Sequence, residues 1–137
     1  MNPILIDTNA YAALKRGHPE AILIVQRAPF LAINSTVLGE LLGGFTHGTK
    51  PEQNRRELEL FLASPRVTLH TVDRATAERY AAIYALLRAS GTPIPTNDLW
   101  IAASAMQHEL SLFSFDAHFR HLPGLRVGAT FAELSAP

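Results

Sequence analysis

The stretch Pro3-Ile4-Leu5-Ile6-Asp7-Thr8-Asn9 decides the fold of this chain. Apolar, strand-forming residues end abruptly at a carboxylate, and polar residues follow at once. In a sheet of parallel strands, ligands bind beyond the carboxyl ends of the strands. A carboxylate is expensive to bury there unless a cation or hydrogen-bond donors accompany it. Asp7 is therefore predicted to be the first ligand of a metal site. The alternative is that Asp7 only caps a helix beginning near Thr8.

Short apolar segments alternate with helical patterns along the rest of the chain. Strands are expected at residues 4–6, 30–33, 67–70, 111–114 and 125–127. Helices are expected near residues 8–17, 19–28, 35–42, 51–63, 74–90 and 97–107, the third of them closed by Gly43-Gly44. This alternation favours a parallel sheet covered by helices on both faces. No linker, repeat or low-complexity tract divides the chain, so residues 1–137 are expected to form a single α/β domain.

The composition excludes several classes of protein. The chain has no cysteine, which rules out disulfides, a cysteine nucleophile and thiolate zinc sites. Its 12 basic and 12 acidic side chains balance, so net charge alone does not indicate a nucleic-acid ligand. That balance can still hide an acidic crevice within a mildly basic surface. No apolar run approaches the roughly 18 residues of a membrane helix, and no cleavable basic segment precedes the first strand. We therefore expect a soluble cytoplasmic protein.

Two further acids lie in predicted helices. Glu40 falls just beyond the apolar stripe of its helix, where it can point into a crevice at the rim of the sheet. The alternative for Glu40 is an ordinary solvated side chain. Asp98 stands in the first turn of a helix that is apolar nearly all round. Asp98 either contributes to the same crevice or only complements the helix dipole.

Asp116 repeats the pattern of Asp7, because an apolar strand again delivers an acid at its end. Helix capping is again the alternative role. These acids converge only if their strands lie side by side. If they do converge, at least three like charges cannot all stay ionised without a cation.

The motifs now on the page resemble those of a PIN domain, and in particular of the VapC-type ribonuclease toxins of toxin–antitoxin pairs. The resemblance is carried by Ile6-Asp7-Thr8-Asn9, the helical Glu40, Asn97-Asp98-Leu99-Trp100-Ile101-Ala102-Ala103, Ser114-Phe115-Asp116-Ala117-His118-Phe119 and Leu122-Pro123-Gly124-Leu125-Arg126-Val127. The segments around Asp98 and Asp116 are the specific ones. Residues from about 47 to 93 match by helix pattern alone.

The resemblance implies a three-layer α/β/α sandwich with a parallel sheet of about five strands. It also implies a catalytic quartet that holds Mg²⁺ or Mn²⁺, made of Asp7, Glu40, Asp98 and Asp116. Asn9 would support these ligands, and Ser114 stands where the family often has Thr, with the hydroxyl kept. The implied activity is metal-dependent cleavage of RNA phosphodiester bonds by attack of a bound water. The implied partners are RNA, a cognate antitoxin and a second copy of the chain.

Because the net charge is zero, RNA binding would have to depend on individual side chains. Lys15, Arg16 and His118 are candidate RNA contacts, and the alternative for each is a solvated surface position. His118 and His121 beside Asp116 suggest zinc, but zinc sites usually recruit more ligands at tighter spacing.

Other classes of protein fit less well. A phosphatase with an aspartate nucleophile requires a second Asp at position 9, which is Asn9, and a later Lys, whereas no Lys follows Lys50. No glycine-rich phosphate loop is present. The remaining alternative is a PIN-like module that binds RNA or a partner without nuclease activity.

Overall fold

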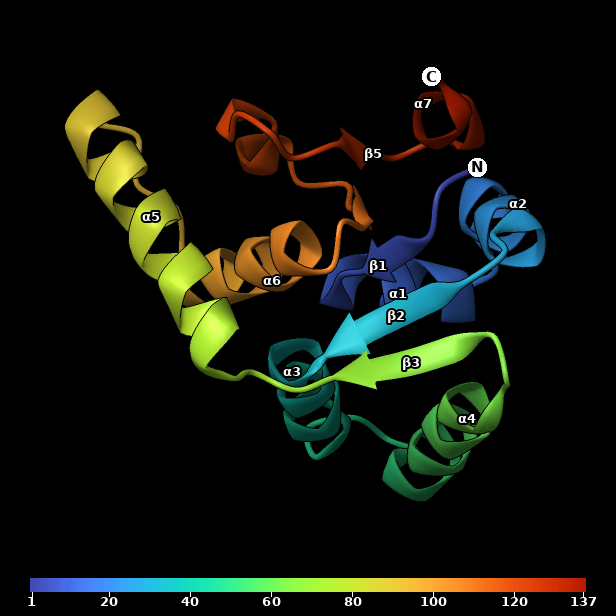
Figure 1. Cartoon of the computed structure of the whole chain (residues 1–137). Coiled ribbons are helices and arrows are strands. Elements are labelled where there is room, and N and C mark those ends of the chain that lie inside the picture. The colour runs from blue at the N-terminus through green and yellow to red at the C-terminus, as the bar shows by residue number, and fades with distance from the viewer.

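The computed structural model describes residues 1–137 as a five-stranded sheet with helices packed around it (Figure 1). The strands are β1 (Ile4–Ile6), β2 (Leu31–Asn34), β3 (Val67–His70), β4 (Ser111–Phe113) and β5 (Val127–Gly128). Their order across the sheet is β3-β2-β1-β4-β5, and every neighbouring pair is parallel. The predicted α/β class with about five parallel strands is confirmed.

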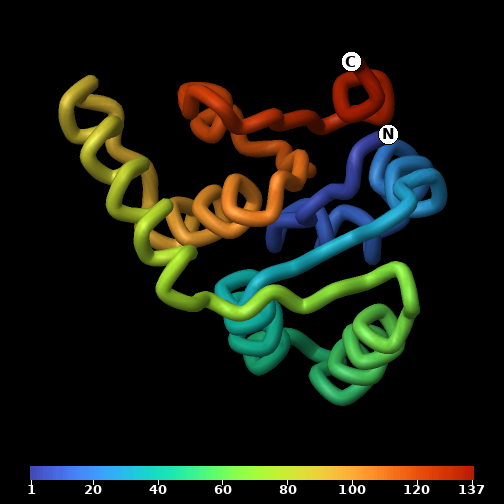
Figure 2. Tube along the Cα trace, viewed as in Figure 1, coloured from blue at the N-terminus to red at the C-terminus, as the bar shows by residue number.

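The helices fill the connections between the strands. They are α1 (Thr8–Lys15), α2 (Pro19–Arg27), α3 (Ser35–Phe45), α4 (Pro51–Ala63), α5 (Arg74–Ser90), α6 (Thr96–Gln107) and α7 (Phe131–Ser135), with a 3₁₀ helix, η1 (Ala117–His121), after β4. Figure 2 shows that α5 reaches out beyond the other helices and that the chain returns along it into α6. No helix is both long and apolar enough to cross a membrane.

The central strand β1 explains why the opening stretch is so apolar. Ile4, Leu5 and Ile6 have no exposed surface, and β1 pairs with β2 on one side and β4 on the other. A parallel strand covered on both faces reads as a continuous apolar run rather than an alternating one. The position of the end of β1 is therefore fixed, and so is the position of Asp7, which follows it.

Polar side chains begin several of the helices. Asp7, Asn34 and Asp73 each accept a hydrogen bond from a backbone amide in the first turn of the helix that follows. The helix beginning after Asp73 ends at Gly91, which adopts the left-handed conformation (φ 68°) that terminates helices. The predicted bounds of this longest helix are confirmed.

Two sequence predictions were wrong in detail, and one helix was missed. The helix α3 runs through Gly43 and Gly44 to Phe45, because its backbone hydrogen bonding continues and these glycines do not adopt positive φ. The last strand is Val127–Gly128 rather than residues 125–127, since only these two residues pair with β4. The helix α7 was not predicted; it begins at the cap Thr130.

Candidate active site

The carboxyl ends of β1 and β4 lie side by side and bring the two strand-end acids together. Ile6 is in register with Phe113, and the amide of Asp7 donates to the carbonyl of Phe113 at 3.2 Å. Asp116 follows three residues after Phe113. The two strands are therefore neighbours, as the sequence analysis required for these acids to converge.

A small cavity of about 90 Å³ opens at this edge of the sheet. It is lined by Asp7, Thr8, Asn9, Glu40, Asp98, Ile101 and Asp116. The structure therefore brings all four predicted acids to one cavity, from the end of β1, the middle of α3, the first turn of α6 and the segment after β4.

Asp7 is the most buried of the four acids, with 3% of its surface exposed. Its Oδ1 accepts a hydrogen bond from the amide of Ala10 at 2.8 Å, so Asp7 also caps α1. Burial raises the pKa of Asp7 from 3.8 to about 6. Hydrogen bonds from Ser114 and Ala10 oppose this rise in pKa, whereas the charges of Asp116 and Asp98 add to it. A positive charge in the cavity would favour the ionised form of Asp7 and so oppose this rise in pKa.

Glu40 is held by two side chains that sequence reasoning did not select. The hydroxyl of Thr8 donates to one carboxylate oxygen at 2.5 Å, and the amide of Asn97 donates to the other at 3.3 Å. Both donors directly adjoin acids of the site in the chain, next to Asp7 and Asp98 respectively. The signal in the sequence was that Thr8 and Asn97 lie in the same motifs as Asp7 and Asp98. Asn9 lines the cavity, but the side-chain hydrogen bonds to Glu40 come from Thr8 and Asn97.

Asp98 is paired with a histidine from η1. Nε2 of His118 lies 2.8 Å from Oδ2 of Asp98. Burial raises the pKa of Asp98, contact with His118 lowers it, and the charges of Asp116 and Glu40 raise it. His118 was a candidate RNA contact, and here it orients a carboxylate of the site.

Asp116 is supported by Ser114 rather than serving as a helix cap. The amide of Asp116 donates to Oγ of Ser114 at 3.0 Å. The Asp116 carboxylate makes no capping hydrogen bond to η1, so the capping alternative fails for this residue. Ser114 is itself buried, and its hydroxyl also contributes to the pKa of Asp7. Ser114 thus joins the two strand-end acids.

The donor set of the cavity fits a hard divalent cation. Its ionisable ligands are four carboxylates, and Mg²⁺ and Mn²⁺ prefer oxygen ligands. In this arrangement no three His, Asp or Glu side chains lie close enough together to hold a metal ion. The agreement with Mg²⁺ or Mn²⁺ therefore lies in the type of donor atom. Few direct protein ligands are needed, because Mg²⁺ keeps several bound waters in sites of this kind.

Lys15 and Arg16, two of the candidate RNA contacts, lie at the carboxyl end of α1. Nζ of Lys15 lies 5.6 Å from the centre of the Tyr11 ring. The turn that includes Arg16 leads to His18, whose ring packs 5.0 Å from that of Phe115. Because Phe115 precedes Asp116, this turn borders the segment that carries one of the acids.

Carboxylates gathered at one edge of a parallel sheet are the arrangement expected for a PIN domain. Residues 4–125 of the chain match the PIN domain family. The chain belongs to the PIN domain family. It is 30% identical to Ribonuclease VapC4 of Mycobacterium tuberculosis over 95 residues, which are 69% of this chain and 73% of that protein. It is 28% identical to Ribonuclease VapC2 of Rickettsia felis over 126 residues, covering 88% and 92% of the two chains.

The likeness extends to three dimensions. The structure matches a chain in the crystal structure of VapBC2 from Rickettsia felis bound to a DNA fragment from its promoter, with a TM-score of 0.79 and 26% identity. The match covers 92% of this chain and 97% of that chain. The predicted resemblance to VapC-type proteins is confirmed.

Proposed function

We propose that this protein is a metal-dependent endoribonuclease and the toxin of a toxin–antitoxin pair. The observation that carries the proposal is the convergence of Asp7, Glu40, Asp98 and Asp116 on one cavity, with the pKa of Asp7 raised by burial and by its neighbours. Perturbed carboxylates gathered in a crevice indicate a functional site. The relatives named as VapC ribonucleases supply the reaction class.

Each acid has a distinct means of being held in place. Asp7 is fixed by the end of β1 and by the Ala10 amide. The two oxygens of Glu40 are fixed by hydroxyl and amide donors, and Oδ2 of Asp98 is fixed by His118. Carboxylates that are already oriented need little rearrangement when a phosphodiester binds, and this lowers the barrier. A bound Mg²⁺ or Mn²⁺ would supply an activated water and neutralise charge developing on the phosphate.

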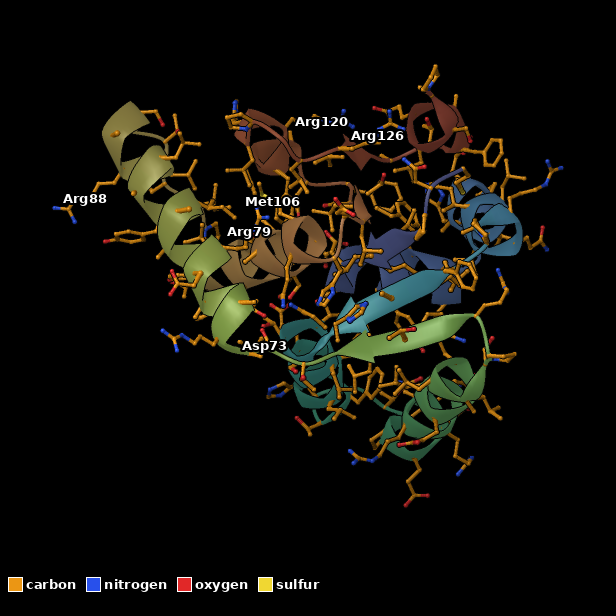
Figure 3. All side chains as sticks on the ribbon, in the orientation of Figure 1. Asp73, Arg79, Arg88, Met106, Arg120 and Arg126 are labelled. Carbon is orange, nitrogen blue, oxygen red and sulfur yellow. The ribbon has the colours of Figure 1, made fainter.

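Cleavage of RNA by the purified protein, with Mg²⁺ or Mn²⁺ and with EDTA, tests the proposal. We expect Asp98→Asn to abolish cleavage, because it removes a carboxylate without changing side-chain shape. Asp73→Asn is the matched control: Asp73 caps the start of α5 (Figure 3), it does not line the cavity, and Asn also caps helices well. Cleavage that survives EDTA or persists in Asp98→Asn would contradict the proposal.

Calorimetry addresses the cation separately from the reaction. Wild-type protein is expected to bind Mn²⁺, and Asp7→Asn is expected to weaken that binding by at least tenfold. Asp73→Asn should bind as the wild type does. Equal Mn²⁺ affinity in all three proteins would contradict the assignment of the acids.

The proposed partner is an antitoxin that covers the acidic cavity. The solved structure described above is of VapBC2, which supports a partner of that kind. An arginine of the antitoxin would fit the cavity, since guanidinium groups bind carboxylates in a bidentate manner. An antitoxin peptide is expected to inhibit cleavage, and its Arg→Gln variant is expected to inhibit at least tenfold less.

We further propose that residues 1–137 fold as one domain, act in the cytoplasm and form a homodimer. Thermal unfolding followed by two spectroscopic probes should show a single coincident transition. Light scattering should give twice the mass of 15.0 kDa. A monomeric mass at micromolar concentration would contradict the dimer.

A further inference from the structure

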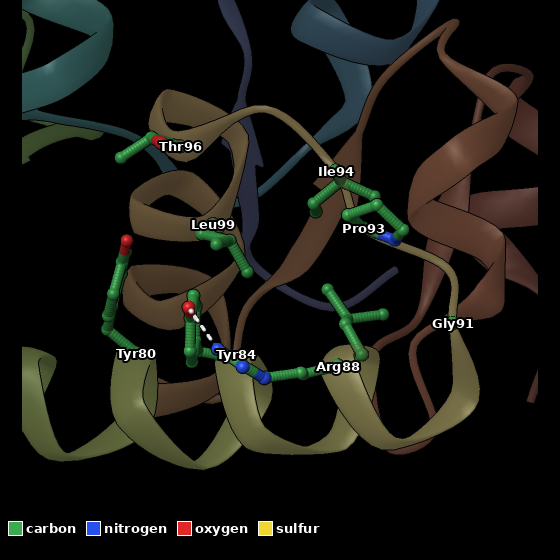
Figure 4. Close-up of a pocket in the computed structure, with 9 residues that line it drawn as sticks. Tyr80, Tyr84, Arg88, Gly91, Pro93, Ile94, Thr96 and Leu99 are labelled. Atoms are coloured by element: carbon green, nitrogen blue, oxygen red, sulfur yellow. Dashed lines mark hydrogen bonds between the residues drawn. The ribbon is translucent and has the colours of Figure 1, made fainter.

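A second cavity lies between α5 and the segment that leads into α6 (Figure 4). Its volume is about 330 Å³. It is lined by Tyr80, Tyr84, Leu87, Arg88, Gly91, Pro93, Ile94, Thr96 and Leu99. The lining is largely apolar and aromatic, and Arg88 is its one charged residue. Pockets of this kind bind flat, partly apolar ligands.

Three aromatic rings form a ladder beside this cavity, which we call the aromatic ladder: Trp100, Tyr80 and Tyr84. The rings of Trp100 and Tyr80 are stacked with centres 4.1 Å apart, and those of Tyr80 and Tyr84 are nearly parallel at 6.3 Å. Tyr84, at the outer end, is 47% exposed. Arg88 donates to the hydroxyl of Tyr84 at 3.3 Å and points outward from α5 (Figure 3). The outer end of the ladder therefore offers an aromatic ring with a cation beside it.

The first turn of α6 separates this cavity from the acidic one. Thr96 and Leu99 line the aromatic cavity, whereas Asp98 and Ile101 line the acidic cavity. Asn97, between them, bonds to Glu40 of the acidic site. A helix is about 10 Å across, so the two cavities are within reach of neighbouring nucleotides of one strand.

We propose that the aromatic cavity binds a base of single-stranded RNA close to the phosphodiester placed at the acids. This inference rests on the proposed function and names where its substrate is gripped. Unpaired bases stack on tyrosine and tryptophan rings, and the stacking tolerates different sequences because every base has a π-face. Arg88 supplies the positive charge that a backbone phosphate requires, and no acidic side chain lines the cavity to repel it.

Two observations favour RNA over an apolar segment of a protein. The aromatic cavity and the proposed cleavage site are lined by residues of the same first turn of α6, on its two sides, so a strand bound at the acids needs to pass only around this helix end to reach the cavity. The outer ring also has a guanidinium bonded to its hydroxyl, which places a cation at the edge of the stacking surface. An apolar protein segment would gain nothing from that charge.

Binding of a single-stranded RNA labelled with 2-aminopurine, measured by fluorescence in EDTA, tests the inference without cleavage. Tyr84→Ala is expected to weaken binding roughly 5- to 100-fold and to lose the quenching of the label. Tyr84→Phe keeps the ring and is expected to bind within about twofold of the wild type. Arg88→Ala should lower the slope of affinity against salt by about one. Leu60→Ala, at an exposed apolar position on α4, is the control.

Each result bears on one proposal or the other. If Tyr84→Ala binds RNA as the wild type does, the inference is wrong, even if cleavage depends on Asp98. If Tyr84→Ala only changes the mass in light scattering, the cavity is an interface between copies of the chain, and the inference is again wrong. If Tyr84 controls RNA binding but no cleavage occurs with Mg²⁺ or Mn²⁺, the base-binding site stands and the nuclease proposal fails.

Discussion

The side-chain amide of Asn34 donates a hydrogen bond to Oγ of Ser104 at 2.8 Å, joining residues 70 positions apart. The same amide donates to the carbonyl of Trp100 at 3.2 Å, and the Asn34 carbonyl oxygen accepts from the amide of Val37 at 2.9 Å. Asn34 and Ser104 have no exposed surface. One side chain thus fixes the start of α3, which carries Glu40, against α6, which carries the next acid of the site.

Asn34→Ala is expected to lower the free energy of unfolding by about 2–4 kcal/mol. It removes a helix cap and the hydrogen bonds that the Asn34 amide donates to Trp100 and to the buried Oγ of Ser104. Ser104→Ala, the control, removes one hydrogen bond and should cost about 1 kcal/mol. Urea unfolding measures both. A loss below about 1 kcal/mol for Asn34→Ala would show that this connection is dispensable.

Asp7→Asn is expected to change how stability depends on pH in metal-free protein. The pKa of Asp7 is raised by burial from 3.8 to about 6, so the folded state binds more protons than the unfolded state between these values. The contribution of Asp7 to stability is therefore fully present at low pH and is lost, by about 3 kcal/mol, as pH rises through this window. Asn keeps the cap on α1 and has no charge to bury. Between pH 4 and pH 7, wild type should lose about 3 kcal/mol more stability than Asp7→Asn does, because other titrating groups affect both proteins alike; parallel curves would contradict this.

His118→Ala is expected to lower kcat for RNA cleavage about tenfold. The histidine holds Oδ2 of Asp98 at 2.8 Å, and loss of one oriented charge-assisted hydrogen bond corresponds to about that factor. His118→Gln can place an amide donor near the same oxygen and should recover part of the activity. Titration of Asp98 by NMR should show a higher pKa in His118→Ala, because contact with His118 lowers it. An unchanged pKa and kcat would rule out this role.

The stacked histidines His70 and His108 are expected to make the protein less stable in acid. Their ring centres lie 3.7 Å apart, with 15° between the planes. Burial, followed by the charge of His108, lowers the pKa of His70, so the folded state binds fewer protons than the unfolded one. Stability is then fully present above pH 6.5 and falls as pH falls through the lowered pKa of His70. His70→Phe keeps a stacked ring and should flatten thermal stability between pH 7 and pH 5.

Gly128→Ala is expected to destabilise the fold by about 1–3 kcal/mol. A Cβ at Gly128 would lie 2.9 Å from Cβ of Glu133 and 2.9 Å from Cγ of Leu134, both in α7. Overpacking of this kind forces backbone shifts. Gly44→Ala is the matched control, because nothing lies within 4 Å of its position inside α3. It should stabilise by about 0.5–1 kcal/mol. Thermal unfolding compares the two, and destabilisation by both would contradict the helical placement of Gly44.

Much of this protein was readable from sequence because local physics dictates it. A strand buried on both faces must be apolar throughout, so Ile4–Ile6 could be recognised, as could the acid that ends it. Asp73 and Gly91 mark the two ends of α5 by cap chemistry that involves near neighbours alone. Signals of this kind are complete within a few residues.

The pairings that complete the site could not be read in this way. Thr8 reaches Glu40 across 32 positions, and Asn97 reaches it across 57. His118 meets Asp98 across 20. No periodicity predicts such contacts, because they depend on the packing of α1, α3, α6 and η1. The short helix α7 was missed for the same reason, since it lies against Gly128 rather than following a long apolar pattern.

The sequence by itself indicated where the five strands and most of the helices lie along the chain, and which four acids are candidates for the site. Apolar runs and cap residues specify local structure wherever they occur in the chain. Only the tertiary structure decided that β1 lies beside β4 and that Asp7, Glu40, Asp98 and Asp116 therefore meet at one cavity. The physical reason is that strand order is chosen by burial of the whole sheet, which no single segment encodes.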